Sequence, residues 1–250
     1  MTTQMLKIEG LTKRYGRHTV VDDLSFDCAA GEVLGFLGPN GAGKSTTMKM
    51  VTGFVAPSAG RAAVCGHDIA TETLAAQQRL GYLPEGAPLY AEMTPLEFLE
   101  FIADVRGLKG ARRTERLDTV IGLLHLGPVL HQATETLSKG FKRRVGLAQA
   151  ILHDPEVLIL DEPTDGLDPN QKHEVRQLIR SMSEDKLIVI STHILEEVEA
   201  VCTRAIIIAD GKLLVDDTPA ALKARGEGDL DVLFRRVTRG EPEGPEDEVA

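Results

Sequence analysis

The sequence predicts an α/β fold with a mainly parallel core sheet, an antiparallel β region near its start and a helical lobe inserted in its middle. Apolar β-branched runs alternate with helical patterns in the second half, which is typical of parallel strands covered by helices. The first 35 residues read as strands punctuated by glycine. Residues from about 87 to 152 carry helical periodicity alone.

The composition is that of a soluble globular protein. The chain has 250 residues, of which 42% are hydrophobic and 26% charged. No apolar run approaches the roughly 18 residues that span a bilayer, and the start lacks the layout of a signal peptide. Cys28, Cys65 and Cys202 are too widely spaced for a disulfide framework or a zinc site. A reducing cytoplasm is the compartment that we expect.

The charge distribution sets one segment apart and excludes one class of partner. The formal net charge is −10, and half of it lies in "GEPEGPEDEVA", with five acids and no base. We predict that this tail, residues 240–250, is disordered. General nucleic-acid binding requires a basic face, so we expect no nucleic-acid partner.

The remaining elements follow in order. A helix is predicted over residues 45–53, after a glycine-rich turn. "TPLEFLEFIADVRG" offers Thr94 as N-cap, Pro95 at the first helical position and Glu97 three residues after the cap. The apolar residues that follow have the spacing of one helix face: Phe98, Phe101, Ile102 and Val105. A second helix repeats it with Leu117, Val120, Ile121 and Leu124.

After the helical lobe the α/β pattern resumes with "EVLILD", an amphipathic helix, "LIVIST", another helix and "AIIIADGKLL". The helix between the first two strands carries Val175, Leu178, Ile179 and Met182. We therefore expect a single domain over residues 1–240. Its α/β core and β subdomain comprise residues 1–86 and 153–225, its helical lobe about 87–152, and its last helix about 229–238.

A glycine-rich loop carries the strongest functional signal. "GPNGAGKST" fits G-x-x-x-x-G-K-[ST], and it stands between the apolar strand "EVLGFL" and a helix, as the motif requires. Backbone N–H groups of such a loop close around a triphosphate, and the helix N-terminus favours anions. Lys44 would neutralise phosphate charge, and Ser45 would ligate Mg²⁺. The predicted nucleotide-binding residues are Gly38, Pro39, Asn40, Gly41, Ala42, Gly43, Lys44, Ser45 and Thr46.

Two carboxylates end the strand in "VLILDEPTDGLD". Asp161 would hold Mg²⁺ through water, and Glu162 would face the water that attacks the γ-phosphate. Phosphoryl transfer needs charge neutralisation and an oriented nucleophile more than covalent chemistry. Two acids after a strand are often only a turn, but the upstream loop favours the catalytic interpretation.

Two further side chains are candidates. His193 directly follows the apolar strand "LIVIST", which should lie next to the strand that carries the acidic pair. There it could hydrogen-bond the γ-phosphate and the attacking water. Tyr15 precedes Gly16 in the first β segment and could stack on adenine. A packed aromatic is an equally good interpretation of Tyr15.

Together these motifs resemble those of the ATP-binding-cassette (ABC) ATPases over residues of about 5–238. The phosphate loop, the acidic pair, the "GLD" turn ending at Asp168 and His193 match in order and spacing. The resemblance implies a P-loop ATPase that uses ATP and Mg²⁺ and pairs with a second copy head to tail. Asp168 would lie at that dimer contact.

The stretch "LSKGFKRR" stands where the family signature LSGGQ belongs. The signature of one cassette completes the ATP site of the other through a serine hydroxyl and a helix N-terminus. Ser138 and Gly140 are present, whereas Lys139 replaces a glycine and Phe141 a glutamine. Neither change removes the hydroxyl or the helix end, so we assign Ser138, Lys139 and Gly140 to nucleotide binding across the dimer.

A second departure is "GYLPE", in which Glu85 stands where most cassettes have a glutamine that touches Mg²⁺. With "LSKG" and "LDPNQ" it resembles the exporter subgroup that includes gliding-motility, sodium and drug efflux ATPases. The resemblance implies an ATPase subunit on the cytoplasmic face of the cell membrane. Polytopic membrane permease subunits would be its partners, received in a groove formed by the helical lobe and the region around Glu85.

Two rival functions belong to other classes. One is a cassette acting in translation or DNA repair, but those types carry two cassettes or long coiled-coil insertions, and this chain has neither. The other is a regulatory module that holds ATP without hydrolysing it, against which Glu162 and His193 argue.

Overall fold

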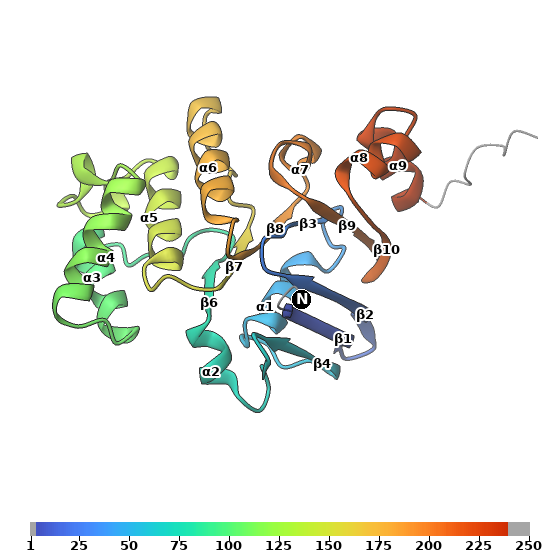
Figure 1. The fold of residues 1–250 in the computed structure, drawn as a ribbon, viewed down its shortest axis with the longest axis horizontal. Coiled ribbons are helices and arrows are strands. Elements are labelled where there is room, and N and C mark those ends of the chain that lie inside the picture. Colours follow the sequence, from blue (N-terminus) through green and yellow to red (C-terminus); the bar gives the residue numbers. More distant parts are fainter. Residues whose placement is uncertain (1–3, 240–250) are drawn as a thin grey trace, which may run out of the picture.

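The computed structural model describes residues 4–239, so the predicted disordered tail lies outside the described residues. A six-stranded sheet with the order β10-β9-β3-β8-β7-β6 forms its centre (Figure 1). Its strands are β3 (Val33–Leu37), β6 (Leu80–Leu83), β7 (Val157–Asp161), β8 (Leu187–Thr192), β9 (Arg204–Ala209) and β10 (Lys212–Asp217). All neighbours pair in parallel except β10, which runs antiparallel to β9.

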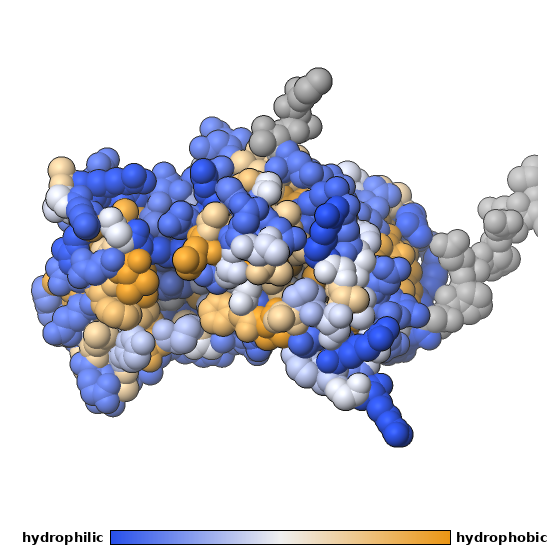
Figure 2. Space-filling model, turned by 90° about the horizontal axis from the view of Figure 1, so that it is seen from below, coloured by the Kyte–Doolittle hydropathy of each residue, from blue (hydrophilic) through white to orange (hydrophobic). Residues whose placement is uncertain are grey.

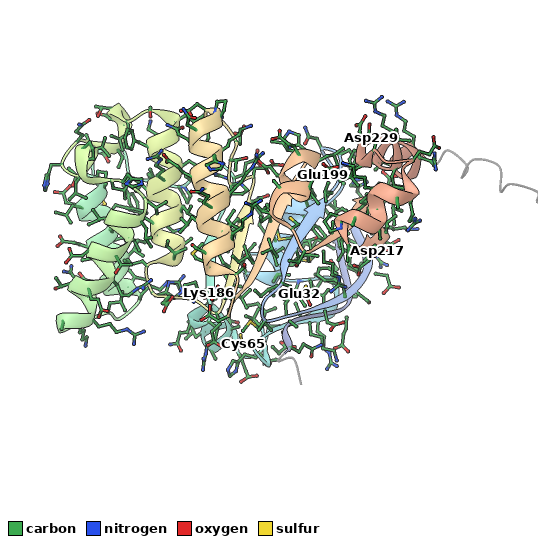
Figure 3. The ribbon with its side chains drawn as sticks, turned by 45° about the horizontal axis from the view of Figure 1, so that its top comes forward. Glu32, Cys65, Lys186, Glu199, Asp217 and Asp229 are labelled. Atoms are coloured by element: carbon green, nitrogen blue, oxygen red, sulfur yellow. The ribbon has the colours of Figure 1, made fainter. Side chains whose placement is uncertain are left out.

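The direction of the parallel strands decides where a site can form. Glu32 and Lys186 stand just before β3 and β8 and mark the amino ends of these strands (Figure 3). The carboxyl ends of β3, β6, β7 and β8 therefore share the opposite edge of the sheet. In open α/β sheets, ligands bind at this carboxyl edge.

A second, antiparallel sheet has the order β2-β1-β4-β5. It consists of β1 (Gln4–Tyr15), β2 (His18–Ala29), β4 (Ala59–Val64) and β5 (His67–Asp68). Helix α1 (Lys44–Val51) lies between the two sheets, and its Met48, Met50 and Val51 are buried in a core to which both sheets contribute. The antiparallel sheet thus holds α1, with the loop before it, against the parallel one.

A group of helices occupies one side of the molecule (Figure 1, left). It contains α3 (Pro95–Val105), α4 (Gly110–Leu123), the short 3-10 helices η1 (Gly127–Val129) and η2 (Thr134–Thr136), and α5 (Lys139–Ile151). These helices share a core with the adjoining sheet, including Leu83 of β6 and Leu158 of β7. Helix α5 contacts β6, so it is the helix of this group nearest to the sheet.

The remaining helices are α2 (Thr73–Gln78), α6 (Pro169–Met182), α7 (Leu195–Val201), α8 (Pro219–Arg225) and α9 (Leu230–Arg239). Leu222, Leu230 and Leu233 join α8 and α9 to β9 and β10 in a third core cluster. In residues 4–239, no helix has both the length and the apolar character needed to cross a membrane.

The structure confirms the predicted fold class and corrects the bounds of one helix. The capping box of Thr94 and Glu97 is present at the start of α3, with Pro95 in its first turn. The residues whose spacing predicted this helix all lie in α3, although Phe101 is 41% and Val105 66% exposed. The helix predicted over residues 45–53 runs instead from Lys44 to Val51, because Gly53 adopts a left-handed φ of 78°.

Candidate nucleotide-binding site

A cavity of about 430 Å³ opens at the carboxyl edge of the parallel sheet. The first turn of α1 and the loops after β3, β6, β7 and β8 supply nearly all of its lining. The lining residues are Val20, Asn40, Gly41, Gly43, Lys44, Ser45, Thr46, Glu85, Glu162, Asp165 and His193. Nine of the predicted site residues therefore meet at one cavity, although they come from positions as far apart in the sequence as 40 and 193.

The loop before α1 has the conformation that an anion cradle requires. Gly43 is the N-cap of α1 with a φ of 101°, and a Cβ atom there would lie 2.6 Å from the carbonyl oxygen of Val20. Only glycine fits this position. The free N–H groups at the start of α1 favour negative charge at the cavity.

Lys44 places a cation in this cradle. Its Nζ donates hydrogen bonds to the carbonyl oxygens of Gly38, at 2.6 Å, and Pro39, at 3.2 Å. Burial lowers the pKa of Lys44, and the negative charges of Glu162, Asp161 and Glu85 act in the opposite direction. Gly38, Pro39 and Ala42 do not line the cavity; they form the loop behind it.

The acidic pair at the end of β7 is divided between a buried and a cavity-facing residue. Asp161 is only 1% exposed, and neither of its carboxylate oxygens has a hydrogen-bond partner among the described residues. The hydroxyl of Ser191, its neighbour across β7 and β8, is likewise buried without a partner there. A buried carboxylate without partners is costly, so Asp161 is suited to a ligand that brings positive charge.

Glu162 follows in an unusual backbone conformation. Its φ of 51° lies in the left-handed region, which turns the chain sharply away from β7. The backbone N–H of Glu162 donates to the carbonyl oxygen of Ser191 at 2.8 Å, so the turn is fixed to β8. Backbone strain of this kind persists where the surrounding structure enforces it.

His193 contacts Glu162 directly. Its Nδ1 lies 2.9 Å from Glu162 Oε1, and the two residues follow adjacent parallel strands. An ionised carboxylate only accepts hydrogen bonds, so Nδ1–H is the donor. In the neutral imidazole this leaves Nε2 as an acceptor.

The residues present fit a magnesium ion whose remaining ligands are phosphate and water. Within residues 4–239, no group of three His, Cys, Asp or Glu side chains could hold a metal ion by itself. Mg²⁺ commonly takes one or two protein ligands together with substrate phosphates. Ser45 at the cavity and the carboxylate of Asp161 behind it, which has no partner in residues 4–239, offer that ligand set.

Comparisons with known proteins agree with this geometry. The profile of the family described as ABC transporter matches residues 21–165. The chain belongs to the ABC transporter family. A solved "ATP binding subunit of ABC transporter" superposes with a TM-score of 0.86 at 30% identity, covering 94% of this chain and 99% of that one.

Several curated ABC transporter proteins are similar to this chain. An uncharacterised ATP-binding protein, YhcH of Bacillus subtilis, is 40% identical over 84% of this chain and 68% of its own length. The probable multidrug ABC transporter protein YbhF of Escherichia coli is 38% identical over 90% of this chain, which spans 39% of YbhF. The Nod factor export ATP-binding protein I of Ralstonia nicotianae is 37% identical over 88% of this chain and 69% of its own length.

Besides Gly38, Pro39, Ala42 and Asp161, five predicted ABC site residues lie outside the cavity lining: Tyr15, Ser138, Lys139, Gly140 and Asp168. Ser138 is an exposed N-cap of α5 that accepts a hydrogen bond from the N–H of Phe141 at 3.3 Å. Gly140 packs on Gln171, whose side-chain oxygen would lie 2.6 Å from a Cβ at that position. Lys139 reaches Asp165 of the same chain at 2.8 Å. Tyr15 is 52% exposed, and Lys13 Nζ lies 5.0 Å from its ring centre.

Asp168 has a clear structural role in this ABC chain. Its Oδ1 accepts hydrogen bonds from the N–H groups of Asn170 and Gln171, forming a capping box at the start of α6. Glu85 lies in the loop after β6, exposed, and lines the cavity.

Sequence reasoning missed two residues at this site. Asp165 lines the cavity, and the ammonium of Lys139 lowers the pKa of its carboxyl. Its only sequence signal is an acid in the turn between Glu162 and Asp168. Arg143 lies behind the cavity and left no signal, because it is one of several basic residues in "KGFKRR" and its partners are backbone carbonyls.

Proposed function

We propose that the chain binds and hydrolyses ATP, with Mg²⁺, as the ATPase subunit of an ABC exporter. The observation that carries the proposal is the convergence of Lys44, Ser45, Glu162 and His193 on one cavity. Behind it lies the buried carboxylate of Asp161, which has no hydrogen-bond partner among residues 4–239. These are the groups that phosphoryl transfer requires: an anion cradle, ligands for a hard cation and a carboxylate that can orient water.

Each group has a distinct task in this proposal. The loop before α1 and Lys44 receive the phosphates of ATP. Ser45 and Asp161, with Glu85 nearby, hold Mg²⁺, which when bound offsets the charge of the phosphates. Glu162 accepts a proton from the attacking water, and the 2.9 Å contact from His193 fixes the direction of its carboxylate.

A second copy of the chain completes the site. Ser138 and the N-terminus of α5 are exposed and do not line the cavity that holds Lys44. They are therefore available to the phosphates bound by a partner copy that packs head to tail. Tyr15 is exposed in the β1–β2 hairpin that also supplies Val20 to the cavity lining, so its ring is available to stack on adenine.

Membrane subunits are the other proposed partners, and an apolar groove offers them a site. A cavity of about 620 Å³ lies between α2 with β6 and the end of α3. Three large side chains at this groove are exposed to an unusual degree: Phe54 at 71%, Leu74 at 77% and Val105 at 66%. Figure 2 shows apolar side chains gathered on the lower face of the molecule, where these elements lie. Exposed apolar patches of this kind mark interaction sites.

Strand β6 links the groove to the nucleotide site. Leu80 and Tyr82 line the groove, whereas Glu85, two residues beyond the strand, lines the nucleotide cavity rather than the groove. A partner bound in the groove would contact β6, the strand that positions Glu85. Such a partner places the subunit on the cytoplasmic face of the membrane, and the multidrug and Nod factor export relatives support export.

The substitution Glu162→Gln tests the proposal. It should preserve ATP binding but slow hydrolysis by on the order of 10²–10⁴-fold, the usual loss for a general base. Unhydrolysed ATP should also hold two copies together, which size-exclusion chromatography with and without ATP would detect. Glu199→Gln is the matched control, because Glu199 is a carboxylate of α7 that pairs with Lys223 and does not line the cavity. A Glu162→Gln variant with normal turnover and no ATP-dependent dimer would contradict the proposal.

A further inference from the structure

Arg143 is a buried cation that the functional proposal does not use. It lies in the second turn of α5, and only 6% of its surface is exposed. A buried charge is costly unless it is paired and hydrogen-bonded. The hydrogen bonds of Arg143 therefore indicate its role.

Its guanidinium group donates hydrogen bonds to backbone carbonyls from two separate segments. Nη1 donates to Pro84 at 3.0 Å, and Nε donates to Pro163 at 3.3 Å. Nη2 donates to both Asp161 and Glu162. A guanidinium has five N–H groups in a fixed plane, so one side chain of α5 fixes the relative positions of these two segments.

Both segments deliver a carboxylate to the nucleotide cavity. Pro84 immediately precedes Glu85, and the second segment contains Glu162 itself; both glutamates line the cavity. Glu162 has the left-handed φ of 51°, and its own backbone carbonyl accepts a hydrogen bond from Arg143. Together with the bond from its N–H to Ser191, this contact holds the Glu162 peptide from both ends.

The charge of Arg143 also suits its surroundings. Burial lowers its pKa, and the negative charges of Asp161, Asp165, Glu162 and Glu85 oppose that effect. A permanent cation behind these four carboxylates reduces their mutual repulsion. A neutral side chain could replace some hydrogen bonds, but it could not supply this charge.

We infer that Arg143 is a positioning residue for hydrolysis, which holds Glu85 and Glu162 at the cavity through backbone carbonyls and without touching the nucleotide. The inference rests on the proposed ATPase function. Arg143 belongs to α5, whose first turn carries Ser138, so it also ties the helix proposed to meet the partner's nucleotide to the catalytic turn of its own chain.

The first experiment compares Arg143→Gln and Arg143→Lys with the wild-type chain. A small displacement of a catalytic group costs on the order of 10²-fold in rate, so Arg143→Gln should lower kcat by about that factor. The Kd for ATP should stay within about twofold, because Arg143 makes no bond to the phosphate loop. Arg143→Lys keeps the charge but not the planar fork, and should lose an intermediate amount of kcat.

Arg116→Gln is the matched control. Arg116 also donates to two backbone carbonyls, those of Ile151 and Leu152, but at the far end of α5. Its loss should leave kcat unchanged. If Arg143→Gln fails to fold, Arg143→Lys decides: wild-type kcat in a folded Arg143→Lys variant overturns the inference, and so does a loss of ATP affinity as large as the loss of kcat.

A double-mutant cycle separates this inference from the proposed function. If Arg143 acts through Glu162, Arg143→Gln should cause little further loss in a Glu162→Gln background. Fully additive losses, both in this background and in a Glu85→Gln background, would show that Arg143 acts through neither glutamate and would overturn the inference alone. Normal turnover in Glu162→Gln itself would instead overturn the proposed function.

Discussion

At the residue scale, His153 shows how burial sets the charge of a side chain in this chain. It follows α5 and its Nε2 lies 3.1 Å from the carbonyl oxygen of Leu80, whereas Nδ1 has no partner among residues 4–239. Burial, with a smaller contribution from the charge of Arg106, lowers the pKa of His153 from 6.5 to about 4. The folded chain therefore keeps this imidazole neutral at pH values where the unfolded chain protonates it.

The stability of the chain should consequently fall in mild acid. Above pH 6.5 both states leave His153 neutral, but between pH 6.5 and about 4 only the unfolded state gains the proton. The stabilisation is thus present at neutral pH and is lost as the pH falls through this window, by up to about 3 kcal/mol. Urea unfolding at pH 7.5 and 4.5 should show a smaller pH-dependent loss for His153→Gln than for the wild type. Substitution of the exposed His131 is the control; equal slopes for all three proteins would refute the prediction.

The sequence predicted the site residues that belong to spaced motifs and missed those that act through the backbone. Lys44, Glu162 and His193 follow strands at fixed positions, so their convergence on one edge follows from the parallel sheet. Arg143 binds carbonyl oxygens, which every residue has, so no pattern of side chains in the sequence predicts its partners. The pairing of Lys139 with Asp165 likewise depends on how α5 packs against the turn after β7.

At the element scale, strands and helix starts were predictable and exposed faces were not. The apolar runs of β7 and β8 are buried at every position, and the capping box of α3 is where its sequence places it. Phe101 and Val105 have the spacing of a packed face but remain exposed. Periodicity identifies an apolar stripe, but it does not distinguish a stripe packed against its own chain from one left for a partner.

Helix α6 allows a structural role to be separated from an assembly role. Asp168 caps this helix through its side-chain oxygen, with Pro169 at the first helical position. Asp168→Ala should lower the free energy of unfolding by about 1 kcal/mol, whereas Asp168→Asn, which keeps the capping oxygen, should change it by only a few tenths. Chemical denaturation measures both values.

A loss of stability that is equal for Asp168→Ala and Asp168→Asn would contradict the capping role. ATP turnover of the two variants then examines the predicted dimer contact. If the negative charge of Asp168 matters across the dimer, turnover should fall in Asp168→Asn although the stability of that variant is preserved.

At the scale of the whole molecule, one part of the proposed site lines the cavity and the other does not. Lys44, Glu85, Glu162 and His193 line one cavity, while Ser138 is exposed at the start of α5 outside that lining. In this conformation, Ser138 is not part of the cavity lining of its own chain. In the proposed head-to-tail pair, each copy would offer Ser138 to the cavity of the other.

Mixing two inactive variants tests this arrangement. Lys44→Ala removes the cation that faces the phosphates, and Ser138→Arg blocks the start of α5, so each variant alone should be inactive. In a mixed dimer, one site combines Lys44 of the Ser138→Arg chain with Ser138 of the Lys44→Ala chain. Equal mixing makes half of the dimers mixed, each with one of two sites intact, so roughly a quarter of wild-type turnover should return if the sites are independent.

A second mixture supplies the control, because Lys44 and Glu162 line the same cavity of one chain. In a mixed dimer of Lys44→Ala and Glu162→Gln, each site lacks one essential group, so no turnover should return. Recovery in the first mixture but not in the second assigns Lys44 and Glu162 to one copy and Ser138 to the other. Recovery in both, or in neither despite mixed dimers confirmed by differential tagging, would contradict a site shared in this way.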